Sequence, residues 1–262
     1  MSVSSSTWRR ASKFYWFTSA FGVGKLIPKI SLSRYVEYPL VYEYLALQDG
    51  HSILDVGTGY SIFPLYLAAK HACQVHVTDN EEYLQDVLRF HAAKIRKLGL
   101  EEGVQVIVEK QDARRLVYPD GAFDRVTCIS VIEHIPDAGD SAAMAEIGRV
   151  LKHGGRALIT VPYAQVYEER ASSPWVEYFE RSYDDKALKE RLIGPSGLVE
   201  VARVFFGEKP NSVSRLYNRN VSSVVRTAVQ MLTPLIAPQI MQIGPTPRST
   251  SHGVMLALEK AE

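Results

Sequence analysis

The amino-acid sequence predicts an α/β fold with a mostly parallel sheet and helices on both of its faces. From residue 51 onward, short apolar runs rich in strand-forming residues alternate with longer segments of helical spacing. Parallel strands need long crossover connections, which helices usually supply. In addition, 46% of the 262 residues are apolar, which is enough to bury the core of one large domain.

Strand and helix candidates alternate between residues 51 and 163. The strand candidates are 51–56, 74–79, 104–109, 123–130 and 156–163. The helix candidates between them lie near 62–70, 82–98 and 138–151. We expect Ser61 to be the N-cap of the first helix, with Pro64 in its first turn, where a missing N–H costs little.

The residues before 51 carry a pattern of their own. An aromatic patch at 14–17 precedes residues 34–47, whose composition and spacing predict a helix. We therefore expect an N-terminal helical cap at 1–48 and a main domain at 49–262, because the alternation of strands and helices begins where these two parts meet.

The last part of the chain departs from the alternation. Two strand candidates, 198–207 and 252–260, are separated by an insertion at about 208–250 rather than by a simple crossover helix. Within the insertion, residues 221–232 have the spacing of an amphipathic helix, and a Pro-broken apolar run follows. Residues 213–243 could form a lid, a dimer contact or a peripheral membrane contact, and the scarcity of basic residues disfavours the membrane.

Charge and composition argue against several classes of function. Lys and Arg number 30 against 29 Asp and Glu, so the net charge does not indicate a nucleic-acid partner. Cys73 and Cys128 lie inside apolar runs, which predicts reduced core thiols, and the histidines lack metal-ligand spacing, so no metal site is expected. No stretch reads as a signal peptide or a transmembrane helix, so we expect a cytoplasmic protein.

The clearest functional motif follows the first strand, where residues 55–59 read Asp-Val-Gly-Thr-Gly. Open α/β sheets bind ligands outside the carboxyl ends of their strands, and glycines there let the backbone lie against a ligand. Twenty residues after Gly59, Asp79 closes the second strand, where a carboxylate can accept hydrogen bonds from two ribose hydroxyls. The pattern predicts a nucleotide-type cofactor pocket.

A nicotinamide or flavin dinucleotide is the main competitor for this pocket. Its fingerprint needs a third small residue, which would stand at position 62 after Gly57 and Gly59. That position is Ile62, whose side chain would crowd the helix against the strand. A dinucleotide oxidoreductase is therefore disfavoured.

With these motifs in place, the sequence resembles the class I S-adenosylmethionine-dependent methyltransferases, of the small-molecule, type 11-like kind, over about residues 50–163. The run LDVGTG (54–59) looks like the first motif of that family, and VTDN (77–80) looks like the second. The most specific match is QDARRLVYPDGAFDRVTCISVIEHIPD (111–137), and LKHGGRALITVPY (151–163) is similar to the turn into the fifth strand.

The resemblance implies a Rossmann-like sheet of seven strands whose last strand is antiparallel, with S-adenosylmethionine as the cofactor. The cofactor-binding residues that it implies are Asp55, Gly57, Thr58, Gly59, Asp79, Asn80, Asp112, Ala113 and Ser130. In this assignment Asp79 holds the ribose, while Asp112 and Ala113 flank the adenine. The family often has a third glycine or small turn residue where this chain has Ser61 after the bulky Tyr60, so we expect Tyr60 to cover or reshape the methionine end. The cofactor carries no phosphate, and no Lys or Arg occurs between Asp55 and Ala69.

A sulfonium makes its methyl group electrophilic, so alignment and desolvation are the main tasks of such an enzyme. If the acceptor is a hydroxyl, a base helps, and Glu133-His134 just past the fourth strand is the best-placed candidate catalytic pair. The alternative is that His134 packs beside the cofactor or bonds to the backbone, while Glu133 faces solvent.

The acceptor itself is predicted only by class. Aromatic residues follow the fifth strand and could line an acceptor pocket or simply pack the connection; they are Tyr163, Tyr167, Trp175, Tyr178, Phe179 and Tyr183. After them, Asp184 or Asp185 is expected to cap a helix. We expect methyl transfer to a small-molecule or lipid- or sugar-linked acceptor, with a non-catalytic cofactor-binding scaffold subunit as the alternative.

Overall fold

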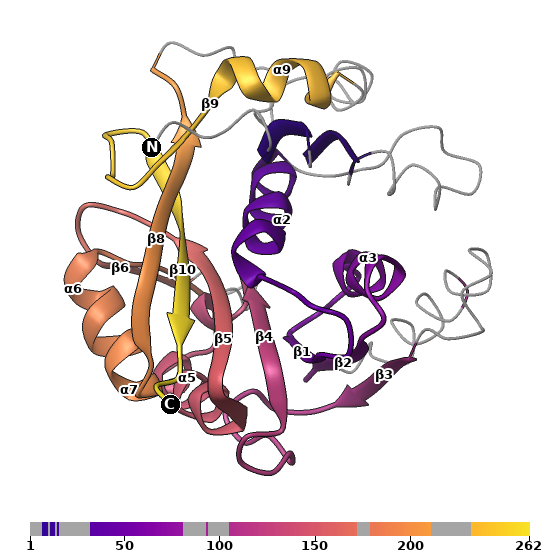
Figure 1. Ribbon diagram of the computed structural model, residues 1–262. Helices are drawn as coiled ribbons and strands as arrows, with labels where there is room; N and C mark the ends of the chain where they lie inside the picture. Colours follow the sequence, from indigo (N-terminus) through magenta and orange to yellow (C-terminus); the bar gives the residue numbers. More distant parts are fainter. Residues whose placement is uncertain are drawn as a thin grey trace.

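An eight-stranded sheet forms the centre of the protein (Figure 1). The computed structural model describes residues 7–9, 11–13, 15, 32–80, 93, 105–171, 179–210 and 232–262. The strands of the sheet are β1 (Ser52–Val56), β2 (Gln74–Asp79), β3 (Gln105–Lys110), β4 (Phe123–Ile129), β5 (Leu151–Pro162), β8 (Val199–Glu208), β9 (Met241–Gly244) and β10 (Ser251–Glu259). Their spatial order is β3-β2-β1-β4-β5-β10-β8-β9.

Strand directions confirm the predicted mostly parallel sheet. β3, β2, β1, β4 and β5 pair in parallel, whereas β10 is antiparallel to both β5 and β8. The predicted count of seven strands is wrong, because β9 from the insertion pairs antiparallel with β8 and adds an eighth. A separate hairpin of β6 (Glu168–Ala171) and β7 (Phe179–Ser182) was also not predicted.

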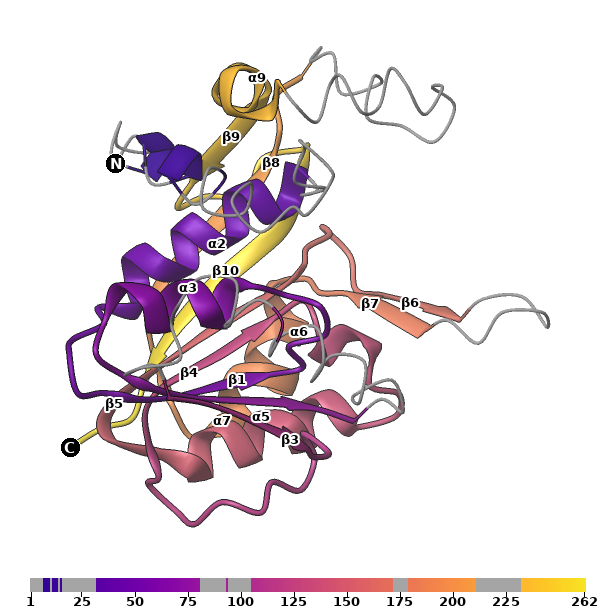
Figure 2. The ribbon, with the colours of Figure 1, turned by 90° about the vertical axis from the view of Figure 1, so that its right-hand side faces the viewer.

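Helices cover both faces of the sheet, as the sequence predicts (Figure 2). On one face lie α2 (Leu32–Leu45), α3 (Phe63–Lys70) and α9 (Thr233–Ile240); on the other lie α5 (Gly139–Val150), α6 (Asp185–Ala187) and α7 (Gly194–Ser196). Successive strand residues alternate between the two cores, so Ile53 packs into the first and Leu54 into the second.

The N-terminal segment and the insertion share one apolar cluster. Tyr35 and Leu40 of α2 belong to the same buried group as Ala237 and Ile240 of α9, and Trp8 stacks on Tyr35. The predicted helices at 82–98 and 221–232 fall outside the described residues, apart from single positions. Within the part of the chain that is described, no helix has the length and apolar character needed to cross a membrane.

At the starts of α3 and α6, one predicted feature is wrong and two others are confirmed. Ile62, not Ser61, is the N-cap of α3; the Ser61 hydroxyl accepts a hydrogen bond from the Phe63 N–H at 3.1 Å and donates to the Tyr38 hydroxyl. Pro64 does occupy the first turn of α3. Asp184 is the N-cap of α6, where its carboxylate accepts from the Ala187 N–H at 2.7 Å.

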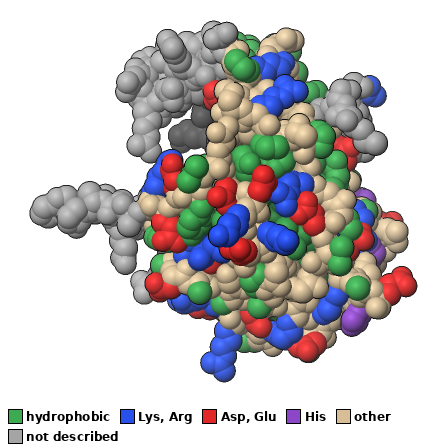
Figure 3. Space-filling view, turned by 90° about the vertical axis from the view of Figure 1, so that its left-hand side faces the viewer, with side chains coloured by type: hydrophobic (Ala, Val, Ile, Leu, Met, Phe, Trp, Pro, Cys, Tyr) green, Lys and Arg blue, Asp and Glu red, His purple; other side chains and the backbone are tan. Residues whose placement is uncertain are grey.

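Charges are mixed on the face of the molecule next to β8 (Figure 3). Arg203 of β8 pairs with Glu200 and with Asp185, and Lys, Arg, Asp and Glu side chains intermingle across the face. This face therefore lacks the single-signed basic patch on which nucleic-acid binding depends.

Gly148 gives a test of how α5 packs on α7. A Cβ at Gly148 would lie only 1.9 Å from the Ser196 carbonyl oxygen. Replacing glycine by alanine inside a helix normally stabilises it, but here we expect Gly148→Ala to lower the free energy of unfolding by about 1–3 kcal/mol through overpacking.

Urea denaturation measures this change. Gly244→Ala is the matched control, because no heavy atom lies within 4 Å of the Cβ that it would add. An unfolding midpoint for Gly148→Ala at or above that of the unsubstituted protein would contradict the packing described here.

Candidate functional site

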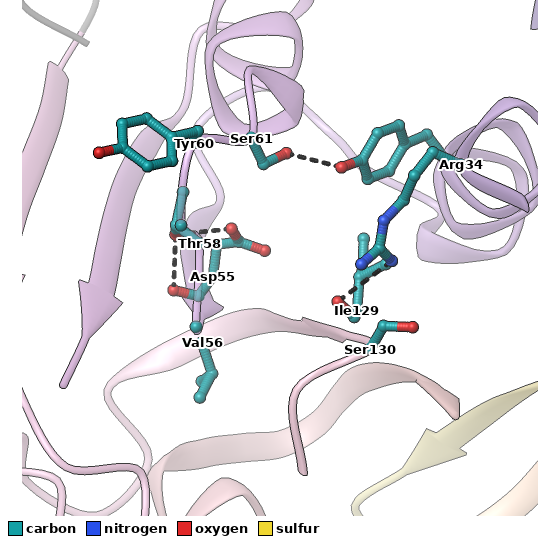
Figure 4. A pocket seen from close by; sticks show the side chains of 11 residues that line it. Arg34, Asp55, Val56, Thr58, Tyr60, Ser61, Ile129 and Ser130 are labelled. Atoms are coloured by element: carbon teal, nitrogen blue, oxygen red, sulfur yellow. Dashed lines mark hydrogen bonds between the residues drawn. The ribbon is translucent and has the colours of Figure 1, made fainter. Parts of the chain in front are cut away.

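Two neighbouring cavities, each of about 300 Å³, lie at the carboxyl ends of the first strands. Val56 and Gly57 border both. The first, which we call the Arg34 cavity, is lined by Arg34, Tyr38, Asp55, Val56, Gly57, Thr58, Gly59, Tyr60, Ser61, Ile129 and Ser130 (Figure 4). The second, the Asp79 cavity, is lined by Val56, Gly57, Asp79, Asn80, Gln111, Asp112, Ala113, Arg114, Val131, His134, Ile135 and Pro136.

The structure thus brings nearly all the predicted site residues to one edge of the sheet. Parallel register explains this, because Asp55 of β1 lies beside Val77 of β2 and Thr127 of β4, so the three strands end together. Among the predicted cofactor-binding and catalytic residues, only Glu133 lines neither cavity.

Asp55 is a buried acid whose carboxylate is held in place by two threonines. It is 4% exposed and accepts hydrogen bonds from the Thr127 hydroxyl and, at 2.7 Å, from the Thr58 hydroxyl. Burial raises the pKa of Asp55 to about 6, although both hydroxyl bonds act in the opposite direction. The carboxylate is therefore suited to a ligand that brings positive charge.

Position 57, which borders both cavities, requires glycine for two reasons. Its φ is +70°, and a Cβ there would approach a methyl carbon of Val131 to 2.4 Å. The N–H groups of Gly57 and Thr58 both donate to the Thr78 carbonyl. The loop after β1 is thus fastened to β2 and packed directly against the loop after β4.

Two further acids face the Asp79 cavity. Asp79 is buried, and one of its oxygens accepts from the Gly59 N–H at 2.8 Å. Asp112 accepts from the N–H and the guanidinium of Arg114, and this hydrogen bonding lowers the pKa of Asp112. Asn80 and Ala113 complete this side of the cavity.

Arg34 is a site residue that the sequence analysis missed. It extends from α2, donates to Glu37 at 2.7 Å, and reaches the Ile129 carbonyl at 3.4 Å, next to Ser130 (Figure 4). Among the residues that line the Arg34 cavity, it is the sole cationic one. The apolar spacing at 34–47 predicts the helix, but no local signal shows that Arg34 contacts a strand 95 positions away.

Ser130 has an uncommon backbone conformation. Its φ is +53°, in the left-handed region that non-glycine residues seldom occupy. Its N–H donates to the Thr160 carbonyl, and its hydroxyl donates to buried Glu37 at 3.4 Å. Such strain is typical of functional sites, where the surrounding contacts hold it.

Glu133 is buried, whereas the neighbouring His134 side chain is partly exposed. Glu133 is 1% exposed, so the alternative in which it faces solvent is wrong. Burial raises the pKa of Glu133 to about 8, and among the described residues its Oε2 has no hydrogen-bond partner. The His134 side chain is 41% exposed, its Nδ1 lies 2.8 Å from the Phe179 carbonyl oxygen, and its Nε2 lies 3.8 Å from Glu133.

Of the remaining predicted residues that the structure describes, Tyr60 lines a cavity and the aromatic residues after β5 line neither. Tyr60 is 54% exposed at the rim of the Arg34 cavity. Tyr163 and Tyr183 are buried in the second core, and Tyr167 packs edge-on to Tyr183. Trp175 and Tyr178 lie outside the described residues, which also hold no group of three or more potential metal ligands.

Residues 53–155 match the family model described as a methyltransferase domain. Among curated proteins, the chain is 35% identical over 119 residues to the methyltransferase GfsG of Streptomyces halstedii, a match that spans 45% of this chain and 40% of that protein. The ubiquinone biosynthesis O-methyltransferase of Xanthomonas oryzae is 35% identical over 112 residues, 42% of this chain and 43% of that protein. The chain thus spans about two fifths of the length of the curated relatives it matches.

Solved structures extend the similarity over most of the chain. A SAM-dependent methyltransferase from Methanosarcina mazei superimposes with a TM-score of 0.58 at 18% identity, covering 86% of this chain and 98% of that one. Residues 53–155 are thus similar to a methyltransferase domain, and the fold around them is the one seen in solved SAM-dependent methyltransferases.

Proposed function

We propose that this protein transfers a methyl group from S-adenosylmethionine to a small-molecule or lipid- or sugar-linked acceptor. The observation that carries the proposal is the pair of adjoining cavities. One combines the cation Arg34 with the buried acid Asp55, and the other combines the acids Asp79 and Asp112.

The chemistry of these groups fits the cofactor. Its amino-acid end carries a carboxylate and an ammonium, which Arg34 and Asp55 would hold. Its ribose has two hydroxyls, which would donate hydrogen bonds to the Asp79 carboxylate. Its adenine would lie beside Asp112 and Ala113. Gly57 borders both cavities and, because it has no side chain, lets Val131 pack directly against the loop after β1.

A pyrophosphate fits these groups poorly. The buried Asp55 carboxylate would repel it, and a phosphate would need N–H groups at the start of α3. One of these, the Phe63 N–H, already donates to the Ser61 hydroxyl. The structure therefore supports the preference for S-adenosylmethionine over a dinucleotide.

When bound, the cofactor supplies an electrophilic methyl group on a cationic sulfur. Arg34, Asp55 and Asp79 would orient it, and the close packing of the loops after β1 and β4 would exclude water from the crevice. For a hydroxyl acceptor, we propose that His134 of the Glu133-His134 pair removes the proton. Glu133, whose raised pKa of about 8 keeps it mostly protonated at neutral pH, would be a neighbouring polar group rather than a second base. The proximity of His134 Nε2 to Glu133 supports this pair.

We also propose a cytoplasmic location without a nucleic-acid partner, and a covering or partner-binding role for segment 213–243. Leu232 and Leu235 at the start of α9 are exposed, whereas Ala237 and Ile240 are packed into the core shared with α2. A lid or a partner could cover these exposed leucines, and the lack of a basic face, with Arg226 the only charged residue between 220 and 247, disfavours a peripheral membrane contact.

Calorimetry with S-adenosylmethionine tests the cofactor, and incubation with methyl-labelled cofactor and a cell extract tests the transfer. We expect binding and a labelled product. Absence of binding would contradict the cofactor assignment, whereas binding with no labelled product from any extract would favour the non-catalytic scaffold.

Asp79→Ala should weaken binding of S-adenosylhomocysteine by about 1–3 kcal/mol, because two ribose hydrogen bonds are lost. Isothermal titration gives the affinity. Asp120→Ala, which removes an exposed acid outside both cavities, is the control and should bind normally. Unchanged affinity in folded Asp79→Ala would refute its assignment to the ribose.

Arg34→Met should weaken S-adenosylhomocysteine binding by about 1–3 kcal/mol, because a charge-assisted contact to the carboxylate is lost. Methylthioadenosine lacks the amino-acid end, so its affinity should not change. Combining Arg34→Met with Glu37→Gln avoids leaving Glu37 as an unpaired buried charge. Equal losses for both ligands would show that Arg34 does not contact the carboxylate.

Asp55→Asn should stabilise the protein while weakening cofactor binding. The pKa of Asp55 is raised from 3.8 to about 6, so the folded state favours the protonated acid. Its contribution to stability is therefore fully present below pH 3.8, falls as the pH rises toward about 6, and levels off above it.

Asparagine cannot ionise, so the variant does not lose stability as the pH rises through the pKa of Asp55. At neutral pH it should be about 1–3 kcal/mol more stable than the unsubstituted protein. Urea denaturation of both proteins across this pH range isolates the effect of one carboxyl. A difference between them that does not change with pH would show that Asp55 titrates normally.

A further inference from the structure

We infer that the β6–β7 hairpin holds loop 131–137 in place and sets the tautomer of His134, with Arg181 as a positioning residue for methyl transfer. This inference rests on the proposed function, in which His134 acts beside the cofactor. Neither strand of the hairpin lines the two cavities, so any effect on the reaction passes through the loop.

Arg181 is the largest side chain that is fully buried among the described residues. From β7, its guanidinium donates one hydrogen bond to the Ile135 carbonyl and another to the Asp137 carbonyl. These carbonyls lie on either side of Pro136, directly after His134. A planar guanidinium donates in fixed directions, so the two bonds together define where this part of the loop lies.

Asp137 shows that the loop needs such support. Its φ is +58°, an unfavourable backbone conformation for a residue with a side chain. A strained residue persists only when surrounding contacts determine its position, and its carbonyl also accepts from Arg191 at 2.8 Å. Two arginines therefore converge on the end of the loop that begins at Val131.

The charge of Arg181 is balanced within the same network. Asp140, which is fully buried, lies 3.8 Å from Arg181, accepts from Arg191 at 2.8 Å, and accepts from the Tyr183 hydroxyl at 3.0 Å. Exposed Glu169 of β6 accepts from Arg181 at 3.1 Å. A buried ion network stabilises a fold little compared with apolar side chains of the same volume, so the geometry it imposes is its distinctive contribution.

The same strand contacts His134 directly. The Phe179 carbonyl oxygen, at the start of β7, lies 2.8 Å from His134 Nδ1, and the Arg181 guanidinium lies 4.5 Å from the centre of the Phe179 ring. A carbonyl can only accept, so Nδ1 carries the hydrogen and Nε2 is the basic nitrogen of the neutral ring. The hairpin thus selects the tautomer that a proton-accepting role at Nε2 requires.

The test compares Arg181→Met with Arg170→Met, a matched change at an exposed position of the same hairpin. Nitrogen NMR of histidine-labelled protein at mildly alkaline pH reports the tautomer of His134. Label transfer from S-adenosylmethionine into cell extract, at saturating cofactor, reports turnover. For Arg181→Met we expect a mixture of tautomers and turnover about ten- to a hundredfold lower, with little change in cofactor affinity. Arg170→Met should match the unsubstituted protein in every measurement.

If Arg181→Met does not fold, Arg181→Lys replaces it, because lysine keeps the charge near Asp140 but cannot donate to both carbonyls in the same geometry. A folded Arg181 variant with the original tautomer and turnover would overturn the inference. Failure of the proposed function is distinguishable, because the unsubstituted protein would then transfer no label while the NMR comparison could still be made.

Discussion

The packing of Gly57 against Val131 is the contact on which the site depends. It joins the loop after β1 to the loop after β4, and Gly57 borders both cavities. A side chain at position 57 would meet Val131 and force the two loops apart, so the shape of both cavities depends on this glycine. Parallel strand order then brings Asp55, Asp79 and Asp112 to the same edge.

The buried acids of this site lower the stability of the folded protein when they are ionised. Burial raises the pKa of both Asp55 and Glu133, so their ionised forms destabilise the folded protein without a ligand. A ligand with cationic groups in the Arg34 cavity would offset part of this cost for Asp55, whereas Glu133 lines neither cavity. Arg34 provides the opposite charge for a ligand carboxylate, and its pairing with Glu37 holds it in place. Ser130, with its strained backbone, donates its hydroxyl to the same Glu37.

Much of the site could be predicted because its signals are local. A glycine turn at a strand end and an acid twenty residues later need only short-range patterns, and the structure places Asp55, Gly57, Gly59 and Asp79 where those patterns indicate. Their contacts with the cofactor remain predictions. Arg34 could not be found in this way, because its role depends on how α2 packs against the end of β4.

The missed strands have a similar explanation. β9 is only four residues long, and its pairing with the edge of β8 is a tertiary contact without a local pattern. The β6–β7 hairpin contains charged residues such as Glu168 and Arg170 rather than alternating apolar ones, and buried Arg181 ties it to the rest of the protein. The residue type of Ser61 predicts an N-cap, but α3 begins one residue later, with Ile62 as its N-cap, although the Ser61 hydroxyl accepts from the Phe63 N–H.

A crystal structure of the protein with S-adenosylhomocysteine tests the central claim most directly. The account predicts adenosine in the Asp79 cavity, with the ribose hydroxyls on Asp79, and the amino-acid end in the Arg34 cavity, with its carboxylate on Arg34 and its ammonium near Asp55. A ligand bound elsewhere, or bound in the reverse orientation, would contradict it.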